Sequence, residues 1–310
     1  NQAKIIMIFD DDKVLAILPL EIKKYFFISM LQWIGTRYAD YCSPILSKNF
    51  DELYNKKEFD HVWSQILSKI NGVDLVFLNN QLANLDSFVN PFVDCFKNTS
   101  FSEVYNIHIS GDFDTYKKNI KKIDKKHAYE VHRTLIKYNK LNESSKVSLE
   151  VKDSYYDSID LRSIIEEKKN QLFKKNINNK FDNSFVKVFE HLIKLKKTQF
   201  YMMSLKYEDQ SISNCFGFKY KETFYYYIPT IPINSFESFK PGKILIIKII
   251  QWCIQNNIKT FDFGLGNEKY KKYFSNKEIS LHRYLKYLTL KGSLACLVIS
   301  LILKIKKLWL

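Results

Sequence analysis

The stretch SFKPGKILIIKIIQWCIQNNIKTFDFGLGNEKYKKYF, residues 238–274, reads as a loop, a helix, a strand and then a basic aromatic segment. The PG pair ends the loop, and apolar residues at roughly helical spacing predict a helix over 242–256. Residues 259–263 are rich in β-forming side chains, and the following GLG opens the backbone where this strand ends. A parallel sheet that diverges at such a point leaves a crevice for a ligand.

The start of this helix is a candidate anion site. Glycine at 242 lets a phosphate approach the backbone closely, and first-turn amides point unpaired donors and a partial positive charge at it. We therefore predict that the cofactor-binding residues are Gly242, Lys243, Ile244 and Leu245. The alternative is an ordinary helix N-terminus without a ligand.

The run FDFGLGNEKYKK, residues 261–272, closely resembles the DFGRGDEPYK signature of the CelD/BcsL-type acetyltransferase-like family, a branch of the GNAT superfamily. It is similar, more distantly, to the end of Fem-type peptidyltransferases. In this chain Leu265, Asn267 and Lys269 replace the Arg, Asp and Pro of the signature. These departures remove any role that the Arg and Asp have in the family.

The resemblance extends over most of the chain. The family's phenol-rich strand and S-P-G loop match FYYYIPTIPINSFESFKPG, residues 224–242, and its opening hairpin matches AKIIMIFDDDKVLAILPLEIKK, residues 3–24. Its basic helix corresponds to the segment that holds Lys121, Lys122, Lys125, Lys126, His132 and Arg133. The resemblance implies an α/β fold with a GNAT-like mixed sheet flanked by helices. It also implies two GNAT-like halves, the N-terminal half being degenerate and incomplete.

Three segments are expected along the chain. They are an N-terminal degenerate GNAT-like half (1–110), a C-terminal GNAT acyltransferase domain (111–288) and an apolar, basic C-terminal helix (289–310). Hydrophobic periodicity predicts strands within 5–22 and over 73–78, 146–151, 200–207, 212–220, 223–228 and 280–287. It predicts helices over 58–70, 112–142, 159–173 and 183–197, with a short helix from residue 90.

The candidate catalytic residues lie beside the predicted crevice. The resemblance implies direct attack of an amine on a thioester, which needs amine deprotonation, oxyanion stabilisation and a proton for the leaving thiolate. Glu268 is the first candidate for amine base or acceptor binding, and the alternative for it is a surface ion pair. Tyr270 is the candidate proton donor to the thiolate or substrate-orienting group. Asp262 is the second carboxylate near the crevice and a further catalytic candidate. The alternative is that it is a buried structural acid.

Candidate substrate-binding residues come from two places. Tyr225 and Tyr227 lie two apart on a strand and therefore share one face, while Tyr226 points to the other. We predict that the first two border the crevice. Lys269 and Lys271 are predicted to bind an acidic acceptor, and a solvated lysine-rich turn is the competing explanation for both.

Composition limits the partners. The net charge of +15 favours a polyanion, but only four of the basic residues are arginine, the side chain expected for bidentate recognition of bases and phosphates. This argues against nucleic acid, except tRNA under one alternative below. His127 and His132 are five apart, not the four of a helical metal pair, so no metal is predicted. The five cysteines are scattered, as expected for reduced thiols of a cytoplasmic protein.

The two ends of the chain carry separate expectations. The chain does not begin with Met and opens on a strand, so we expect further residues upstream. Near the C-terminus, residues 293–303 are free of charge and flanked by Lys291 and by Lys304, Lys306 and Lys307. This run is too short to span a bilayer. It is either a core or dimer helix or a peripheral contact with the inner face of a membrane.

The leading hypothesis is a GNAT-type N-acyltransferase that moves an acyl group from acyl-CoA, such as acetyl-CoA, to an amine of a small-molecule acceptor. The resemblance implies a sugar, an amino acid or a cell-envelope or polysaccharide precursor as that acceptor. One alternative is a Fem-like transferase that depends on aminoacyl-tRNA. Another is a non-catalytic scaffold of a polysaccharide-synthesis complex.

Overall fold

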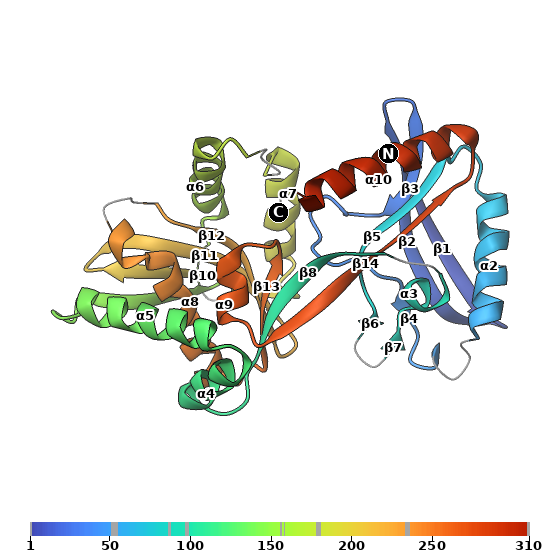
Figure 1. Ribbon diagram of the computed structural model, residues 1–310. Coiled ribbons are helices and arrows are strands. Elements are labelled where there is room, and N and C mark those ends of the chain that lie inside the picture. Colours follow the sequence, from blue (N-terminus) through green and yellow to red (C-terminus); the bar gives the residue numbers. More distant parts are fainter. Residues whose placement is uncertain are drawn as a thin grey trace. The chain divides into compact units, whose positions relative to one another are not determined.

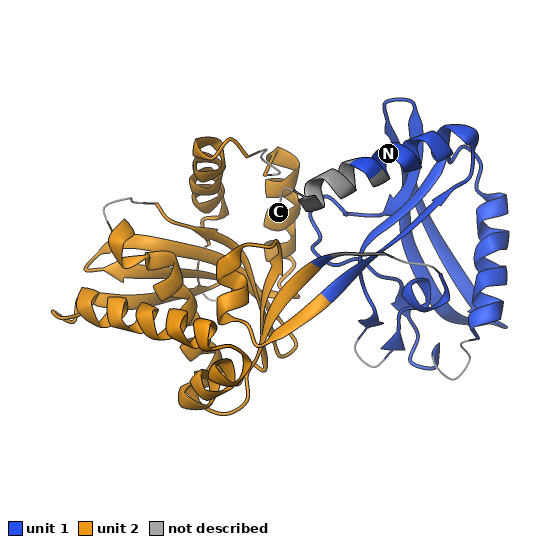
Figure 2. Ribbon diagram, viewed as in Figure 1, with its two compact units in different colours: residues 1–102, 280–310 blue, residues 103–279 orange. Residues whose placement is uncertain are grey.

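The computed structural model describes residues 2–50, 55–85, 88–96, 99–155, 157, 159–177, 181–232 and 236–308. It divides into two compact units, one made of residues 1–102 with 280–310 and the other of residues 103–279 (Figure 2). We call them unit 1 and unit 2 and describe each by itself. The chain passes between them within strands β8 (Thr99–His108) and β14 (Lys277–Tyr287). The predicted domain limits at 110 and 288 stay a prediction.

Unit 1 is built on a mixed sheet in the order β1-β2-β3-β5-β14. Neighbouring strands are antiparallel except β3 and β5, which are parallel. Besides β14, its strands are β1 (Gln2–Asp10), β2 (Lys13–Tyr25), β3 (Ile28–Trp33), β4 (Ile45–Leu46), β5 (Leu75–Leu82), β6 (Asn84–Leu85) and β7 (Phe88–Val89). The predicted opening hairpin and the predicted strand at 73–78 are therefore confirmed.

The core of unit 1 lies between this sheet and two helices, α2 (Lys56–Lys69) and α3 (Pro91–Cys95). Trp63 and Phe92 are almost fully buried, and their rings meet edge to face with centroids 4.9 Å apart. The indole of Trp63 donates to the hydroxyl of Tyr284 on β14 (3.2 Å). A third helix, α10 (Leu290–Leu308), ends the unit.

Unit 2 carries the antiparallel meander that the sequence predicts. Its sheet runs in the order β8-β13-β12-β11-β10-β9, where only β12 and β13 are parallel. The strands are β9 (Val147–Asp153), β10 (Gln199–Tyr207), β11 (Gln210–Tyr220), β12 (Thr223–Thr230) and β13 (Thr260–Leu265). The helix that connects β12 to β13 is α8 (Pro241–Gln255).

The helices of unit 2 cover both faces of the sheet (Figure 1). One face packs against α8 and α5 (Lys125–Leu141), and the other against α6 (Leu161–Lys174) and α7 (Asn183–Lys194). Two further helices are α4 (Phe113–Ile123) and the short α9 (Lys269–Phe274), and a 3-10 turn, η1 (Glu237–Phe239), precedes α8. Ile244, Leu245 and Ile247 of α8 lie in the core of this unit.

The single helix expected over 112–142 is wrong, because the chain breaks at Asp124. This residue is extended, with φ of −156°, and its carboxylate accepts from the backbone N–H of Lys126 (2.7 Å). It therefore ends α4 and caps α5. Helix α9 and strands β3, β4, β6, β7 and β8 were not predicted from the sequence.

No helix in the described part of the chain is both long and apolar enough to cross a membrane. The side chains of Lys304, Lys306 and Lys307 lie outside the described residues, so the prediction that they flank an apolar run stays untested.

Candidate functional site

Strands β12 and β13 run together for only three residue pairs and then part. The pairs are Thr223 with Thr260, Phe224 with Phe261 and Tyr225 with Asp262, although β12 continues to Thr230 and β13 to Leu265. The two strand ends that point toward α8 and α9 are therefore not joined by a ladder. A divergence of this kind in an open sheet is where a ligand reaches the strand edges.

Helix α6 supports the end of β12 on one side of this divergence. The Nζ of Lys168 donates to the carbonyl oxygen of Pro229 (2.8 Å), and the side-chain amide of Gln171 donates to that of Ile231 (3.2 Å). Between them, the hydroxyl of Thr230 donates to the carboxylate of Glu167 (2.6 Å). Three successive residues at the strand end are thus held in place by one helix.

The first turn of α8 has a backbone N–H at Gly242 that the described residues leave without an acceptor. The helix follows Lys240, which has a left-handed φ of 58°, and the N–H groups of Lys243 and Ile244 both donate to the carbonyl of Lys240 (2.9 and 3.4 Å). Pro241 has no N–H. Among the described residues, the N–H of Gly242 meets no backbone acceptor. Among the backbone amides predicted to bind acyl-CoA, the amide of Gly242 is therefore still able to donate a hydrogen bond to a ligand.

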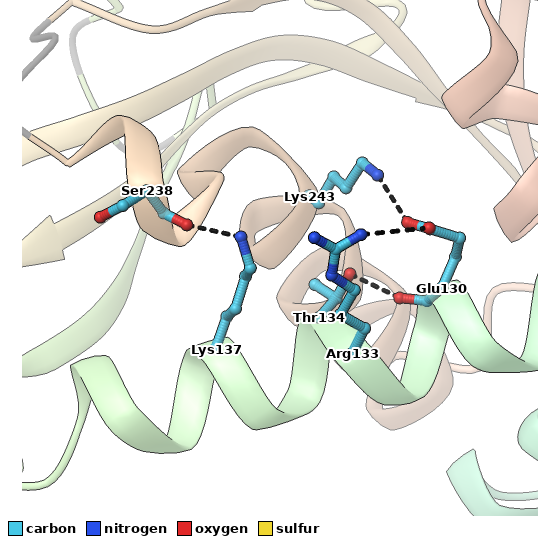
Figure 3. Close-up of polar contacts among 6 residues, drawn as sticks. All are labelled: Glu130, Arg133, Thr134, Lys137, Ser238 and Lys243. Atoms are coloured by element: carbon cyan, nitrogen blue, oxygen red, sulfur yellow. Dashed lines mark hydrogen bonds and ion pairs between the residues drawn. The ribbon is translucent and has the colours of Figure 1, made fainter.

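The side chain of Lys243 is engaged with α5 (Figure 3). Its Nζ donates to Oε2 of Glu130 (2.8 Å), whose other oxygen lies 3.7 Å from Arg133. The hydrogen bond from Lys243 lowers the pKa of Glu130, so the carboxylate stays charged. One turn along α5, Lys137 donates to the carbonyl of Ser238, which lies just before α8. These contacts position the start of α8 against α5.

The first half of the FDFGLGNEKYKK motif forms a turn that its own residues stabilise. Asp262 is buried, and its Oδ1 accepts from the N–H of Gly264 (2.7 Å). Gly264 has a φ of 63° and Gly266 a φ of 124°, which side chains disfavour. The alternative reading of Asp262 as a buried structural acid therefore fits this geometry.

The second half of the motif holds that turn through a buried lysine. The side chain of Lys271 is 5% exposed, and its Nζ donates to the carbonyl of Leu265, approaches that of Gly264 (3.5 Å) and lies 3.1 Å from Oε2 of Glu268. A Cβ on Gly266 would collide with the carboxylate of Glu268. Lys271 is thus a structural cation in this structure, and not an exposed lysine that faces an acceptor, whereas Lys269 is exposed. Glu268 is half exposed.

Tyr270 takes no part in the contacts that hold this turn. Its ring meets Phe263 edge to face (6.2 Å), and its hydroxyl has no hydrogen-bond partner among the described residues. Burial raises the pKa of Tyr270, and the charge of Glu268 adds to the effect. The phenol therefore keeps its proton well above neutral pH, as a proton donor must.

Tyr225 and Tyr227 share one face, as predicted, since both rings contact Phe218 (4.7 and 6.0 Å). This face is covered by α7, whose Phe189 stacks on Tyr227 at 5.3 Å. Tyr226 lies on the opposite face, 5.9 Å from Phe263. The structure places the two predicted substrate-binding phenols in an aromatic cluster beneath α7, and a substrate role for them stays a prediction.

Lys168 is a site residue that the sequence analysis missed. It lies on the buried side of α6, one turn after Ile164 and Ile165, and desolvation lowers its pKa to about 8. The charges of Glu268 and Lys271 also act on it. Because it follows two core residues at helical spacing, the period of α6 is the signal that could have identified it.

The lowered pKa of Lys168 predicts how stability depends on pH. Between about pH 8 and its ordinary value of 10.5, the folded protein holds Lys168 neutral while the unfolded chain binds a proton there. Unfolding then takes up a proton, so the free energy of unfolding rises with pH in this window. Relative to Lys168→Met, the wild type should gain about 1 kcal/mol or more between pH 7.5 and 10, measured by urea unfolding.

The control for this measurement is Lys169→Met. Lys169 is the next residue and pairs with Glu166 (2.5 Å) outside the strand end. Its stability curve should run parallel to that of the wild type. If the curve of Lys168→Met also ran parallel, Lys168 would be titrating as it does in the unfolded chain.

Comparisons with known proteins agree with this architecture. Residues 126–272 match the family model described as acetyltransferase (GNAT) domain. Among solved structures, the chain is similar to FemX, with 11% identity and a TM-score of 0.56 over 92% of this chain and 88% of that one. None of the curated proteins compared with the sequence matches it.

Two other solved structures share the fold. The C-terminal domain of a lysylphosphatidylglycerol synthetase, named as putative, from Agrobacterium fabrum has 11% identity and a TM-score of 0.55, over 96% of this chain and 87% of that one. A tandem GNAT protein from the clavulanic acid biosynthesis pathway has 7% identity and a TM-score of 0.51, over 91% and 82%. The predicted fold class, mixed sheets flanked by helices in two GNAT-like halves, is confirmed.

Proposed function

We propose that this protein is an N-acyltransferase that moves an acyl group from acyl-CoA to a small-molecule amine. The observation that carries the proposal is the state of Tyr270. Asp262, Gly264, Glu268 and Lys271 hold the motif's turn together, while the Tyr270 hydroxyl is left with its proton and without a hydrogen-bond partner in the described residues. Tyr270 lies on α9, and a short turn joins this helix to the end of the diverging strand β13.

The donor end of the proposed site is the start of α8. The Gly242 amide and the helix dipole favour an anion, as the pyrophosphate of acyl-CoA is. A Cβ on Gly242 would lie 3.4 Å from Ile231, an ordinary contact, so the first turn lies directly against the end of β12. Lys243 adds positive charge beside this turn, although its ammonium is shared with Glu130.

The chemistry follows from these groups. The acceptor amine attacks the thioester carbonyl carbon, a C–N bond forms, the C–S bond breaks and the thiolate takes the hydroxyl proton of Tyr270. The amine loses one proton to a base, and the phenolate of Tyr270 recovers one, so no proton is gained or lost overall. The carboxylate of Glu268, or Lys168 in its neutral form, would take the proton of the amine, since burial lowers the pKa of Lys168 to about 8.

The acceptor in this proposal is an amine on a sugar, an amino acid or a cell-envelope or polysaccharide precursor. Lys269 is exposed next to Glu268 and would attract an acidic acceptor. The support for polysaccharide chemistry is the resemblance of FDFGLGNEKYKK to the CelD/BcsL-type signature. On this proposal the protein acts in the cytoplasm, where acyl-CoA is available.

The test is calorimetric binding of acetyl-CoA and longer acyl-CoAs to the wild type, Gly242→Asp and the control Gly242→Ala. Aspartate puts a negative charge where the pyrophosphate would lie, and alanine adds a methyl group of ordinary contact distance. We expect Gly242→Asp to weaken binding about 100-fold and Gly242→Ala to change it less than about threefold.

Both variants must first show the wild-type circular dichroism and unfolding midpoint. Equal affinity in Gly242→Asp and the wild type would move the donor away from α8. Absence of any acyl-CoA binding by the folded wild type would contradict the proposed donor itself.

A second candidate is an aminoacyl-tRNA-dependent transferase. The observation that favours it is a run of exposed lysines around the break between α4 and α5: Lys118, Lys121, Lys122, Lys125 and Lys126. Binding of tRNA whose affinity falls steeply with salt, together with no affinity for acyl-CoA, would favour this candidate. The scaffold alternative would require that neither donor binds.

A further inference from the structure

The turn between β2 and β3 presents two phenylalanines to solvent. Tyr25 pairs with Ile28, so Phe26 and Phe27 alone form the tip of this hairpin. Their side chains are 99% and 90% exposed. Phe26 also has a φ of 52°, a conformation that glycine and asparagine favour in two-residue hairpins. Because both rings are almost fully exposed, they add little to the core of unit 1, which indicates a function other than folding.

In the part of helix α10 whose side chains are described, five large apolar side chains are exposed. Leu290, Leu294, Leu297, Val298 and Leu301 are 56–88% exposed and follow one another at i, i+4, i+7, i+8 and i+11, which is one helical face. The helix also packs closely against the rest of unit 1. At Gly292 the contact leaves no room for a side chain, because a Cβ there would collide with the carbonyl of Asp74. A helix that only completes a globular core would show the reverse arrangement.

These two features meet at one pocket of unit 1. The pocket, of about 440 Å³, is lined by Phe26 and Phe27 of the hairpin tip and by Thr289 and Lys291 at the start of α10. Lys24 also lines it. The exposed apolar surface therefore has cations on both of its elements.

The one acid that lines this pocket is already occupied. Asp74 accepts from the N–H of Ser29 (2.9 Å) and from the hydroxyl of Thr289 (2.7 Å), and these bonds lower its pKa. The charge of Lys291 also acts on this carboxylate, so the protein itself balances part of the Asp74 charge. The surface offers apolar side chains and ammonium groups outward, which is the combination that anionic lipid attracts.

We propose that the Phe26–Phe27 tip and the outer face of α10 form a membrane-binding surface that inserts shallowly into an anionic lipid bilayer. The aromatic tip would enter the boundary between headgroups and acyl chains, and α10 would lie in the interface plane. Lys24 and Lys291 pair with lipid phosphates at the same depth.

A bilayer fits this surface better than a second copy of the chain. A stable dimer interface is close-packed and complementary, whereas here two rings, 99% and 90% exposed, stand on a hairpin tip. A fluid lipid bilayer can surround exposed side chains without a surface that is complementary in shape to them. The lysines beside both elements repel an identical positively charged copy but attract anionic headgroups.

The experiment is flotation of the full chain with vesicles of phosphatidylcholine alone or with about one third phosphatidylglycerol. The first variant replaces the tip with residues that suit its backbone, Phe26→Gly with Phe27→Asn, because only residue 26 has a positive φ, and it should fold at least as well as the wild type. The second, Leu294→Gln with Leu297→Gln, changes only exposed positions of α10. The matched control is Phe173→Ser, an 83% exposed phenylalanine of unit 2.

We expect the wild type to bind the anionic vesicles and each of the two double variants to bind at least about tenfold more weakly. Phe173→Ser should bind as the wild type does, and added salt should weaken binding. Equal binding by the wild type and the double variants, or no binding to anionic vesicles, would overturn the proposal. So would a wild-type dimer in sedimentation that Leu294→Gln with Leu297→Gln dissociates, because α10 would then be an interface between copies.

Discussion

Tyr270→Phe should lower kcat about 10²- to 10⁴-fold, the range that a positioned general acid contributes. The expected loss is the same in kcat and in kcat/KM, because the hydroxyl acts on the leaving thiolate and not on bound substrate. Release of the CoA thiol, followed with a thiol reagent and any amine that supports wild-type turnover, measures it. Acyl-CoA affinity should stay within about threefold of the wild type.

The substitution leaves the fold intact for a structural reason. The ring of Tyr270 keeps its contact with Phe263, and the lost hydroxyl had no hydrogen-bond partner among the described residues. The unfolding midpoint should therefore not fall. Tyr273→Phe is the matched control, since Tyr273 lies on the same short helix and its ring faces Lys243 (5.8 Å). Turnover by Tyr270→Phe within a few-fold of the wild type would mean that water protonates the thiolate.

Local patterns were sufficient to predict the elements that build unit 2. The meander was readable because polar pairs separate runs of β-forming residues, and the chain turns there through Glu208 and Lys221, both at a φ of 52°. Pro241 marks the first position of α8 because its missing N–H costs nothing there. Such signals depend on neighbours in sequence, so tertiary contacts do not obscure them.

Elements defined by tertiary context were missed. Residues 104–107 of strand β8 are all buried, with the polar Asn106 between Tyr105 and Ile107, so they show neither alternation nor a continuous apolar run. The helical period continues across Asp124 because α4 and α5 both contribute to the same core, through Ile120 and Val131. Periodicity alone therefore reads two helices as one.

The motif located the candidate site but not the roles of its residues. The three lysines of KYKK, residues 269–272, look alike in the sequence, yet in the structure Lys269 is exposed and Lys271 is buried. Likewise, the rings of α7 that cover Tyr227 are more than thirty residues away from it along the chain. Which side chains are occupied by structure, and which are left for chemistry, depends on contacts that spacing does not encode.

Lys271→Met should therefore lower the free energy of unfolding by about 3 kcal/mol, although the sequence suggested an acceptor-binding residue. The buried ammonium of Lys271 donates to the carbonyl of Leu265. It also lies close to the carbonyl of Gly264 and to the carboxylate of Glu268. Methionine fills similar space but donates nothing, so buried carbonyls lose their partner and Glu268 loses its counter-charge. Urea unfolding monitored by tryptophan fluorescence measures the change.

Lys269→Met separates the structural role from a binding role. It makes the same chemical change two residues earlier, at an exposed position, and should alter the free energy of unfolding by less than about 0.5 kcal/mol. If Lys271 instead bound the acceptor, Lys271→Met would keep wild-type stability and raise KM for the amine. Since the turn that Lys271 holds leads directly into Tyr270, the expected result also links the stability of this turn to the placement of the proposed acid. Partial unfolding that begins at this turn should then remove turnover before unit 2 as a whole unfolds.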